Sequence, residues 1–337
     1  MGGTAVLLDR GRLVSRLRGL ALDAWRGWER FFFTPTSTAP LAVLRIAFGL
    51  VVTLWTATQL PNLFAFYGPD GVLPQPPAIG PWQWGLLTTS NSVAVLSVVF
   101  LATLLAGIAL TIGASPRIAA VVVLLGLIAF ERRNPYVLNS GDILLRVMAV
   151  YLVFAPSGES LSWDRWRRDR AHFWEFPRRA PWAMRMLQVQ VSIIYLAAVW
   201  AKLQGDPWRN GTAVSFALRM LDQLRAPPPE LIAGSGLLTE WLTFGTLLIE
   251  LSVGIFVWNR RLRPWVLGAG ALLHLGIEVF IMVGFFSIGM WVLYLVFLSP
   301  DWTERTVLRL RDRLRARRAP APEPARENAR EPVVSET

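Results

Sequence analysis

The chain has 337 residues, of which 53% are hydrophobic and 17% are charged, and its mean hydropathy is +0.42. One water-soluble globule cannot bury that much apolar surface, so these values exclude an ordinary soluble domain and indicate a polytopic membrane protein. The absence of cysteine excludes disulfide frameworks, thiol catalysis and Cys-ligated metal centres. Because His172 and His274 are the two histidines of the chain, a histidine-rich metal centre is not expected, and no metal cofactor is predicted.

Residues 1–38 predict an amphipathic cytoplasmic helix that leads into the first span. They contain no clean apolar run bounded by a cleavage-like site, so a removable signal peptide is not indicated. Charged residues fall on one helical face and apolar residues on another: Arg12, Arg16, Asp23, Arg26 and Arg30 against Leu13, Leu17, Leu20, Ala24 and Trp28. Such a helix is expected to lie in the lipid headgroup layer or, alternatively, against the protein's own loops.

Eight apolar stretches follow, and they are expected to form the transmembrane helices. They cover residues 39–60, 92–112, 114–130, 143–155, 183–201, 237–257, 264–283 and 285–298. A helix rises about 1.5 Å per residue, so about 20 residues are needed to cross the ~30 Å hydrocarbon core. The third, fourth and eighth stretches are shorter and could be partly re-entrant. The sequence therefore predicts an all-α, polytopic helical bundle of about eight transmembrane helices, within a range of seven to nine.

The basic residues predict the orientation of this bundle. If the eight stretches all cross, 26 of the 34 basic residues lie on one side and six on the other. The positive-inside rule then places both termini in the cytoplasm and the protein in the plasma (inner) membrane. The transmembrane domain is predicted over residues 39–300. The tail, 301–337, is expected to begin as a basic helix at the anionic leaflet and to be disordered over 319–337.

Ionisable residues inside the apolar stretches are costly and require partners. Arg45 is expected to snorkel to lipid phosphates from the cytoplasmic end of the first span. Arg146 is expected to pair with Glu131 or Asp142, mainly as a structural ion pair.

Three further ionisable residues lie in the seventh stretch and the one before it. Glu250 is expected to meet an arginine of the turn at 258–263. His274 and Glu278 are four residues apart on one helical face, which fits either an acid and base pair or two buried polar groups that satisfy each other.

Lys202 is the one lysine among 34 basic residues. A buried lysine can lose its proton whereas an arginine cannot, so Lys202 is a candidate base, although a chance lysine at the outer end of the fifth span is an equal alternative. Polar residues predicted on the same outer side suggest a cavity for an amphipathic ring ligand such as a lipid-borne quinone. The candidate catalytic residues are Lys202 and His274, and the candidate ligand-binding residues are Asn134, Tyr136, Asn139, Asp142, Arg146, Tyr195, Trp208 and Glu278.

Four segments resemble the HTTM (horizontally transferred transmembrane) domain, the membrane part shared with vitamin K-dependent gamma-carboxylase. They are Glu131–Arg146, Phe154–Gly158 with Ser162 and Asp164, Tyr195–Leu203 with Trp208, Gly211 and Ala213, and Phe286–Met290. The matches run from about residue 40 to 300, and the Tyr, Lys-Leu, Trp and Gly block is the most specific.

The resemblance implies a cofactor and a mechanism. In the carboxylase, a lysine of this block deprotonates reduced vitamin K, oxygen adds, and the resulting base removes a γ-proton from glutamate before carbon dioxide is captured. By position Lys202 would be that base, with reduced vitamin K or menaquinol as the cofactor. Asn134 matches the Asn of the family's Asn-His pair, whereas Pro135 stands in place of the His. His274 matches a second family histidine if one extra helical turn is allowed.

The sequence leaves two functions open. In the first, the protein binds a reduced quinone and carries out quinol oxygenation or carboxylation-type chemistry, as a lyase-like enzyme. The carboxylase has a large extramembrane region after its spans that this chain lacks, so carboxylation of a protein is not expected. In the second, it is a non-enzymatic protein of the sporulation-delaying-protein-B type, acting in immunity, toxin maturation or lipid and peptide binding. The expected partners are the membrane, a lipid or quinone and a small peptide or protein; nucleic acid is not expected.

Overall fold

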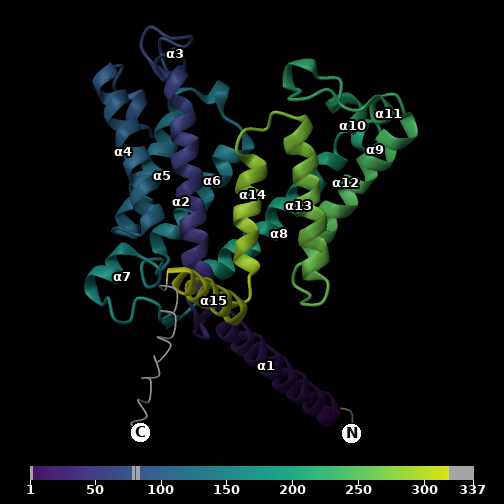
Figure 1. The fold of residues 1–337 in the computed structure, drawn as a ribbon. Helices are drawn as coiled ribbons and strands as arrows, with labels where there is room; N and C mark the ends of the chain where they lie inside the picture. Colours follow the sequence, from purple (N-terminus) through teal and green to yellow (C-terminus); the bar gives the residue numbers. More distant parts are fainter. Residues whose placement is uncertain (1–2, 78–79, 81–83, 319–337) are drawn as a thin grey trace, which may run out of the picture.

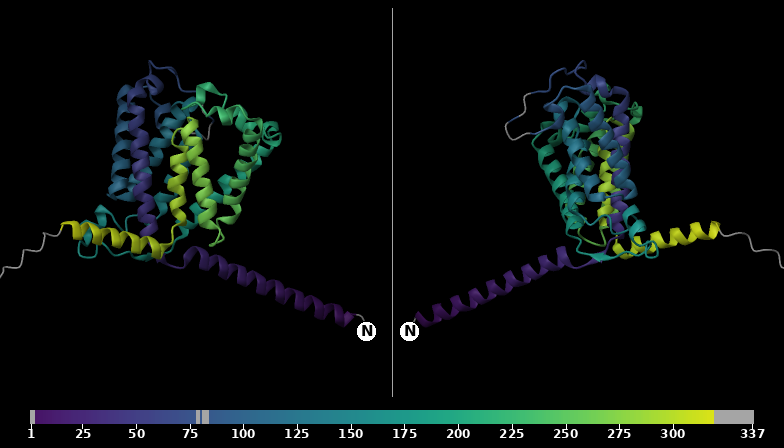
Figure 2. Two further views of the ribbon diagram at one scale, coloured as in Figure 1. Left: turned by 45° about the vertical axis from the view of Figure 1, so that its right-hand side comes forward. Right: turned by 90° about the vertical axis from the view of Figure 1, so that its left-hand side faces the viewer.

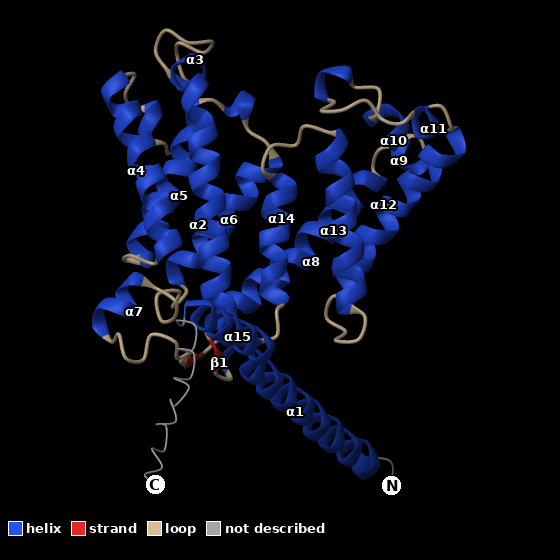
Figure 3. Cartoon of the chain, in the orientation of Figure 1, coloured by secondary structure: helices blue, strands red, loops and turns tan. Residues whose placement is uncertain are grey.

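The structure is a computed structural model that describes residues 3–77, 80 and 84–318, and it is almost entirely helical (Figure 1). Within these residues, eight helices coincide with the eight apolar stretches of the sequence. They are α2 (Ala39–Gln59), α4 (Val93–Ile112), α5 (Pro116–Arg133), α6 (Ser140–Phe154), α8 (Trp182–Leu203), α12 (Gly236–Phe256), α13 (Arg263–Phe280) and α14 (Phe286–Tyr294). Figure 3 shows one short pair of antiparallel strands, β1 (Thr36–Ser37) and β2 (Arg178–Arg179). The prediction of an all-α helical membrane bundle is confirmed.

Four helices of the described part are long and apolar enough to cross a membrane. They are α2 with its continuation to Tyr67, α4, α8 and α12. The helix α14 and the 3-10 turn η5 (Leu295–Phe297) form a shorter apolar segment. The helices α5, α6 and α13 correspond to the other stretches, so the count of eight spans stays a prediction.

The two ends of the bundle carry different short elements. At one end, which we call the basal end, lie α1 (Gly3–Phe33), α7 (Trp163–Arg168), α15 (Pro300–Arg318) and the β1 and β2 strands (Figures 1 and 2). At the other, distal end lie α3 (Leu63–Tyr67), α10 (Ala213–Ala217) and α11 (Glu230–Ala233), and α9 (Asp206–Arg209) connects α8 to α10. The sequence predicts that the basal end faces the cytoplasm.

The helix α1 leaves the basal end and extends away from the bundle (Figure 2). Its last turn is fixed by Arg185 of α8, whose Nε donates to the carbonyl of Phe31 over 3.2 Å. Leu17, Leu20 and Trp28, from the predicted apolar face, are exposed. This arrangement suits a helix that lies in the headgroup layer. The predicted disorder of 319–337 lies outside the described residues.

Glycines allow α2, α4 and α5 to approach closely. A Cβ on Gly49 of α2 would overlap Thr111 of α4, and a Cβ on Gly107 of α4 would approach Thr53 of α2 to 2.8 Å. Gly126 of α5 faces Thr103 of α4 in the same way. Lipid is as apolar as a leucine side chain, so close van der Waals contact at small residues, rather than the hydrophobic effect, holds such helices together.

The prediction that Arg45 snorkels to lipid phosphates was wrong. Its side chain is fully buried at the basal end of α2. The guanidinium donates to the carbonyls of Ser157 at 2.7 Å and Leu161 at 2.6 Å. The loop after α6 folds over the end of α2 and supplies these acceptors, which the sequence alone does not place there. Arg45 therefore joins α2 to the loop at 155–162 through hydrogen bonds.

Substitution of Arg45 by alanine should destabilise the protein. The change removes a buried guanidinium and leaves the carbonyls of Ser157 and Leu161 without their donor, a cost of about 3 kcal/mol or more. We expect a clearly lower midpoint of thermal unfolding in detergent, followed by tryptophan fluorescence. The exposed Arg117 is the matched control: Arg117→Ala should leave the midpoint within about a degree, as expected for a surface change. Equal midpoints for both variants would contradict this role of Arg45.

Candidate functional site

The single lysine forms an ion pair inside the bundle. Lys202 lies in the last turn of α8, which packs against α12, and its Nζ donates to both carboxylate oxygens of Glu250, at 2.5 and 2.6 Å. The side chains are 23% and 9% exposed, respectively. The indole ring of Trp208 lies 5.1 Å from Nζ and gives a cation-π contact. The expectation that Glu250 pairs with an arginine at 258–263 was wrong, because α8 brings Lys202 to this carboxylate.

The Lys202 ammonium lies deeper than the outer mouth at which the sequence analysis placed it. The helix α12 runs from the distal to the basal end, and Glu250 is six residues before its last residue, Phe256. After α8 ends, α9 and α10 run back along α12 toward the distal end, and the backbone N–H of Val214 donates to Thr243 over 3.1 Å. The chain that follows Lys202 thus covers the pair from the distal side. Sequence spacing cannot reveal this because it assumes that each span ends at the surface.

A chain of hydrogen bonds lies beside the ion pair. The hydroxyl of Tyr195, on α8, is bonded to Nε2 of His274 on α13 over 2.7 Å, and also to the hydroxyl of Tyr294 on α14. All three side chains are buried. Gly270 of α13 leaves the space that the Tyr294 hydroxyl occupies. Nδ1 of His274 is buried and has no hydrogen-bond partner in the described part of the chain.

The ion pair and the hydrogen-bonded chain interact electrostatically. The charge of Lys202 acts on His274, and the charge of Glu250 acts on both Tyr195 and Tyr294. Four helices, α8, α12, α13 and α14, therefore contribute one polar cluster within an otherwise apolar bundle. Such clusters are expensive in hydrocarbon and mark sites of proton or ligand chemistry by default. We call Lys202, Glu250, Tyr195, His274 and Tyr294 the lysine cluster.

The structure does not bring Glu278 to His274. Both lie on α13, but Glu278 forms an ion pair of 2.8 Å with Arg225, in the segment that covers the distal end. The imidazole instead uses Nε2 to bond Tyr195. Sequence spacing placed His274 and Glu278 on one helical face correctly, while tertiary packing supplied each with a closer partner.

The predicted residues of the hairpin after α5 form a separate group. Asn139 and Asp142 make a capping box at the start of α6: Oδ1 of Asn139 accepts from the N–H of Gly141 at 2.7 Å, and Oδ2 of Asp142 accepts from the N–H of Asn139 at 2.8 Å. Nε1 of Trp55 donates to Asp142 at 2.7 Å. Nδ2 of Asn134 donates to the carbonyl of Phe66 at 2.9 Å. These side chains form hydrogen bonds with backbone N–H and carbonyl groups and fix α2, α5 and α6 to one another.

A cavity of about 310 Å³ lies next to the hairpin. Its lining includes Asn134, Asn139 and Asp142, with Trp55 and Phe285. Lys202, His274 and Tyr195 are not among its lining residues. The residues expected to line one outer cavity therefore fall into two separate groups, one at the hairpin cavity and one in the lysine cluster. Phe286, next to Phe285 at the start of α14, packs edge-on against the His274 ring at 5.4 Å and so links the two.

Two other predicted residues have clear positions. Arg146 of α6 forms an ion pair with the buried Glu131 of α5, one of the two partners expected for it. Tyr136 is 80% exposed on the hairpin and does not line the cavity.

Sequence reasoning missed Glu250 as the partner of Lys202, and it missed Tyr294 altogether. Each of these two residues has a feature in the sequence that could have identified it. Glu250 is an acid within an apolar stretch, and Tyr294 is one of five tyrosines in the chain and ends the helix of the Phe286–Met290 motif.

These features define the class of protein: an all-α membrane protein with a polar, proton-bearing cluster enclosed by four of its helices. The HTTM domain model matches residues 33–302, which is most of the chain, and the chain belongs to the HTTM family. The resemblance seen in the sequence is confirmed at this level. No solved structure matches the chain.

Glu250→Leu should destabilise the protein by leaving the Lys202 ammonium without its carboxylate. Removing one partner of a buried ion pair costs about 3 to 5 kcal/mol, whereas replacing both with apolar residues is often neutral. We therefore expect Glu250→Leu to lower the unfolding midpoint in detergent, and Lys202→Met combined with Glu250→Leu to restore most of it. A double variant that is no more stable than the single variant would show that the pair is not coupled.

Proposed function

We propose that this HTTM protein binds a reduced quinone beside the lysine cluster and uses Lys202, together with Glu250, to accept a proton from a ring hydroxyl. The observation that carries the proposal is the ion pair of Lys202 with both oxygens of Glu250, deep in the bundle and partly exposed on the lysine side. We also propose that the basal end faces the cytoplasm of a cell whose plasma membrane holds the protein.

The residues present fit such a ligand. Nδ1 of His274 is buried without a partner in the part of the chain that the structure describes, so it can bond a hydroxyl that the protein does not supply. Trp208 offers an aromatic face next to the ammonium. When bound, a reduced quinone supplies an acidic hydroxyl and the electrons for reaction with oxygen.

The lysine and the glutamate can take up one proton between them. In the resting ion pair the shared proton lies on Nζ of Lys202. Nζ passes this proton to Oε1 of Glu250 and takes another from the ring hydroxyl, which leaves an ammonium beside a neutral carboxylic acid. The pair thereby gains one proton and one positive charge, which balances the negative charge left on the ligand. Removal of water strengthens this charge balance, because the low dielectric of the bundle increases electrostatic interaction.

The buried hydroxyls next to the pair can position this chemistry. Tyr195 holds Nε2 of His274 in place and is itself held by Tyr294. With Nε2 engaged, Nδ1 is the imidazole atom that remains for a ligand. The hydrogen bond at one ring nitrogen thus fixes the orientation of the imidazole, as it does for histidines in general.

The direct test compares Lys202→Arg and Glu250→Gln with the unsubstituted protein. Arginine preserves the ion pair but does not give up its proton. Glutamine preserves a hydrogen-bond acceptor, but its amide does not take up a proton. We expect both variants to remain folded and to lose oxygen consumption and epoxide formation with reduced vitamin K or menaquinol by roughly 10²-fold or more. The purified protein in lipid nanodiscs is the material for the measurement.

The matched control is Arg209→Gln, an exposed change on α9 close along the chain to Lys202. It should retain full turnover. No turnover of any quinol by the unsubstituted protein, or turnover that both Lys202→Arg and Glu250→Gln retain, would overturn the proposal.

The hairpin favours a second candidate, a non-enzymatic role of the sporulation-delaying-protein-B type. Asn134, Asn139 and Asp142 direct most of their polar atoms into the protein's own backbone, as residues of a structural scaffold do. In that case deletion of the protein should change the sensitivity of cells to a peptide toxin, and Lys202→Arg should complement the deletion fully. Unchanged sensitivity on deletion would count against this role.

A further inference from the structure

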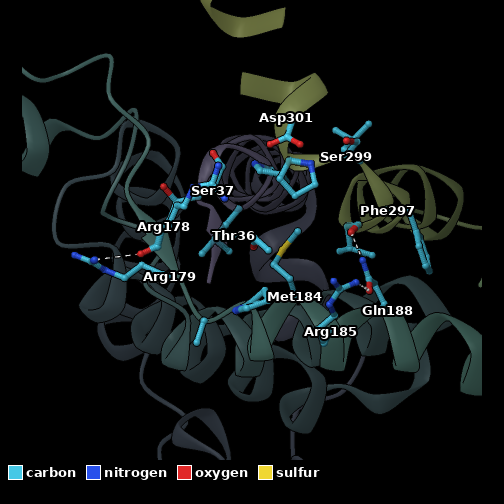
Figure 4. A pocket seen from close by; sticks show the side chains of 18 of the residues that line it. Thr36, Ser37, Arg178, Arg179, Met184, Arg185, Gln188, Phe297, Ser299 and Asp301 are labelled. Atoms are coloured by element: carbon cyan, nitrogen blue, oxygen red, sulfur yellow. Dashed lines mark hydrogen bonds between the residues drawn. The ribbon is translucent and has the colours of Figure 1, made fainter. Parts of the chain in front are cut away.

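A second cavity lies at the basal end of the bundle, and its lining shares no residue with the lysine cluster. It has a volume of about 540 Å³ and lies between the β1 and β2 strands, the start of α2, the first turns of α8, the turn between α12 and α13, and the start of α15. Figure 4 shows Met184, Arg185 and Gln188 along α8 on one side and Ser299 and Asp301 across the cavity from them. A cavity of this size suits a small amphipathic ligand or a headgroup.

The lining of this basal cavity is strongly positive. It includes five arginines and one carboxylate, that of Asp301; the arginines are Arg178, Arg179, Arg185, Arg260 and Arg263. Arg179 pairs with Glu159 at 3.1 Å. The other four have no carboxylate partner among the side chains that the structure describes, those of residues 16–77, 80 and 84–318. Arg185, Arg260 and Arg263 act on one another electrostatically. Such repulsion favours a bound anion, since the single carboxylate of the lining, that of Asp301, forms no ion pair with these arginines in the described structure.

Two of these guanidinium groups are held in fixed positions. Nε2 of Gln188 donates to the carbonyl of Val296 at 2.6 Å, and Oε1 of Gln188 accepts from Nη1 of Arg185 at 2.9 Å. Nε of Arg263 donates to the carbonyl of Val257 at 2.8 Å. Nη2 of Arg185 and both Nη atoms of Arg263 have no acceptor in the described chain. Pre-positioned guanidinium groups with free N–H donors match the geometry of phosphate oxygens.

The lining also has an apolar part. Leu41, Met184, Phe297 and Leu298 line the same cavity as the arginines. The cavity also lies where α1 joins the bundle, since the Arg185 guanidinium stacks over the Phe31 ring at 4.7 Å. An amphipathic helix at this level indicates the depth of lipid headgroups. Charge and apolar surface together suit a ligand with a phosphate and a short stretch of hydrocarbon.

We propose that the basal cavity binds a phosphate group, and that its ligand is the headgroup of an anionic phospholipid whose first methylenes contact Met184 and Phe297. The arginines supply the charge-assisted hydrogen bonds, and Gln188 positions Arg185 for them. This site shares no residue with the lysine cluster, so it stands whether or not the protein binds a quinone.

The test measures lipid binding to the intact purified protein by native mass spectrometry. Dioctanoyl phosphatidic acid is titrated, with dioctanoyl phosphatidylcholine, which has no net charge, as the comparison. We expect saturable binding of phosphatidic acid well above that of phosphatidylcholine. Arg185→Gln combined with Arg260→Gln should weaken phosphatidic acid binding by about tenfold or more, since each lost charge-assisted hydrogen bond contributes about this much.

Two further variants make the result specific. Arg178→Gln combined with Arg260→Gln changes two exposed arginines whose side chains make no hydrogen bond in the described structure, so it should fold normally and still weaken binding. Arg309→Gln combined with Arg313→Gln removes the same charge from exposed positions of α15 at the same end. That control should leave binding within about twofold, as expected for exposed charges screened by solvent.

Competition with inorganic phosphate distinguishes a lipid headgroup from free phosphate as the ligand of the cavity. If millimolar phosphate leaves lipid binding unchanged, the lipid headgroup is the ligand. If phosphate displaces the lipid, and the cavity variants also weaken the binding of phosphate, the cavity is a site for free phosphate. That result supports a phosphate site in the cavity, with free phosphate rather than a lipid headgroup as its ligand. Equal binding of the two lipids, or equal weakening in the cavity variants and the α15 control, would overturn the proposal.

Discussion

The interaction on which the candidate site depends is the ion pair between Lys202 and Glu250. An ammonium at this depth is tolerated because a carboxylate from another helix meets it with both oxygens. The pair also joins α8 to α12, which pack against each other although the chain between them makes a long excursion through α9, α10 and α11. Under the proposed function, the groups that hold two helices together are also the groups that exchange a proton.

The same constraint governs the other polar residues of the bundle. Arg45 meets the carbonyls of the loop after α6, Arg146 meets Glu131, and Asp142 meets both Trp55 and the start of its own helix. In hydrocarbon an unpartnered polar group costs several kcal/mol, and each of these residues has a partner in a neighbouring segment, although Nε of Arg45 and Oε1 of Glu131 have none in the described residues. Further unpartnered polar atoms lie at the two candidate sites. Nδ1 of His274 in the lysine cluster and the free guanidinium donors of the basal cavity are polar groups that the described chain leaves for something else.

The two ends of the molecule have different character. The lysine cluster is nearly neutral, compact and enclosed by helices, which suits proton exchange with a membrane-borne ligand. The basal cavity carries an excess of arginine and lies beside α1 and α15, which suits the phosphate proposed for it at the level of the headgroups. Taken together, the two proposals describe an HTTM protein that is anchored to one leaflet through its arginines and exchanges protons within the bundle.

The sequence by itself determined the class of this protein, its family resemblance and the position of nearly every long helix, because hydrophobicity over about twenty residues is a local property of the chain. It also identified Lys202, Tyr195 and His274 as chemically unusual. The partners were decided by tertiary structure: Glu250 rather than His274 or the hairpin meets Lys202, Tyr195 rather than Glu278 meets His274, and a loop rather than lipid meets Arg45. Residues far apart in the chain become neighbours through helix tilt and the path of the connecting segments, and neither of these is encoded in periodicity.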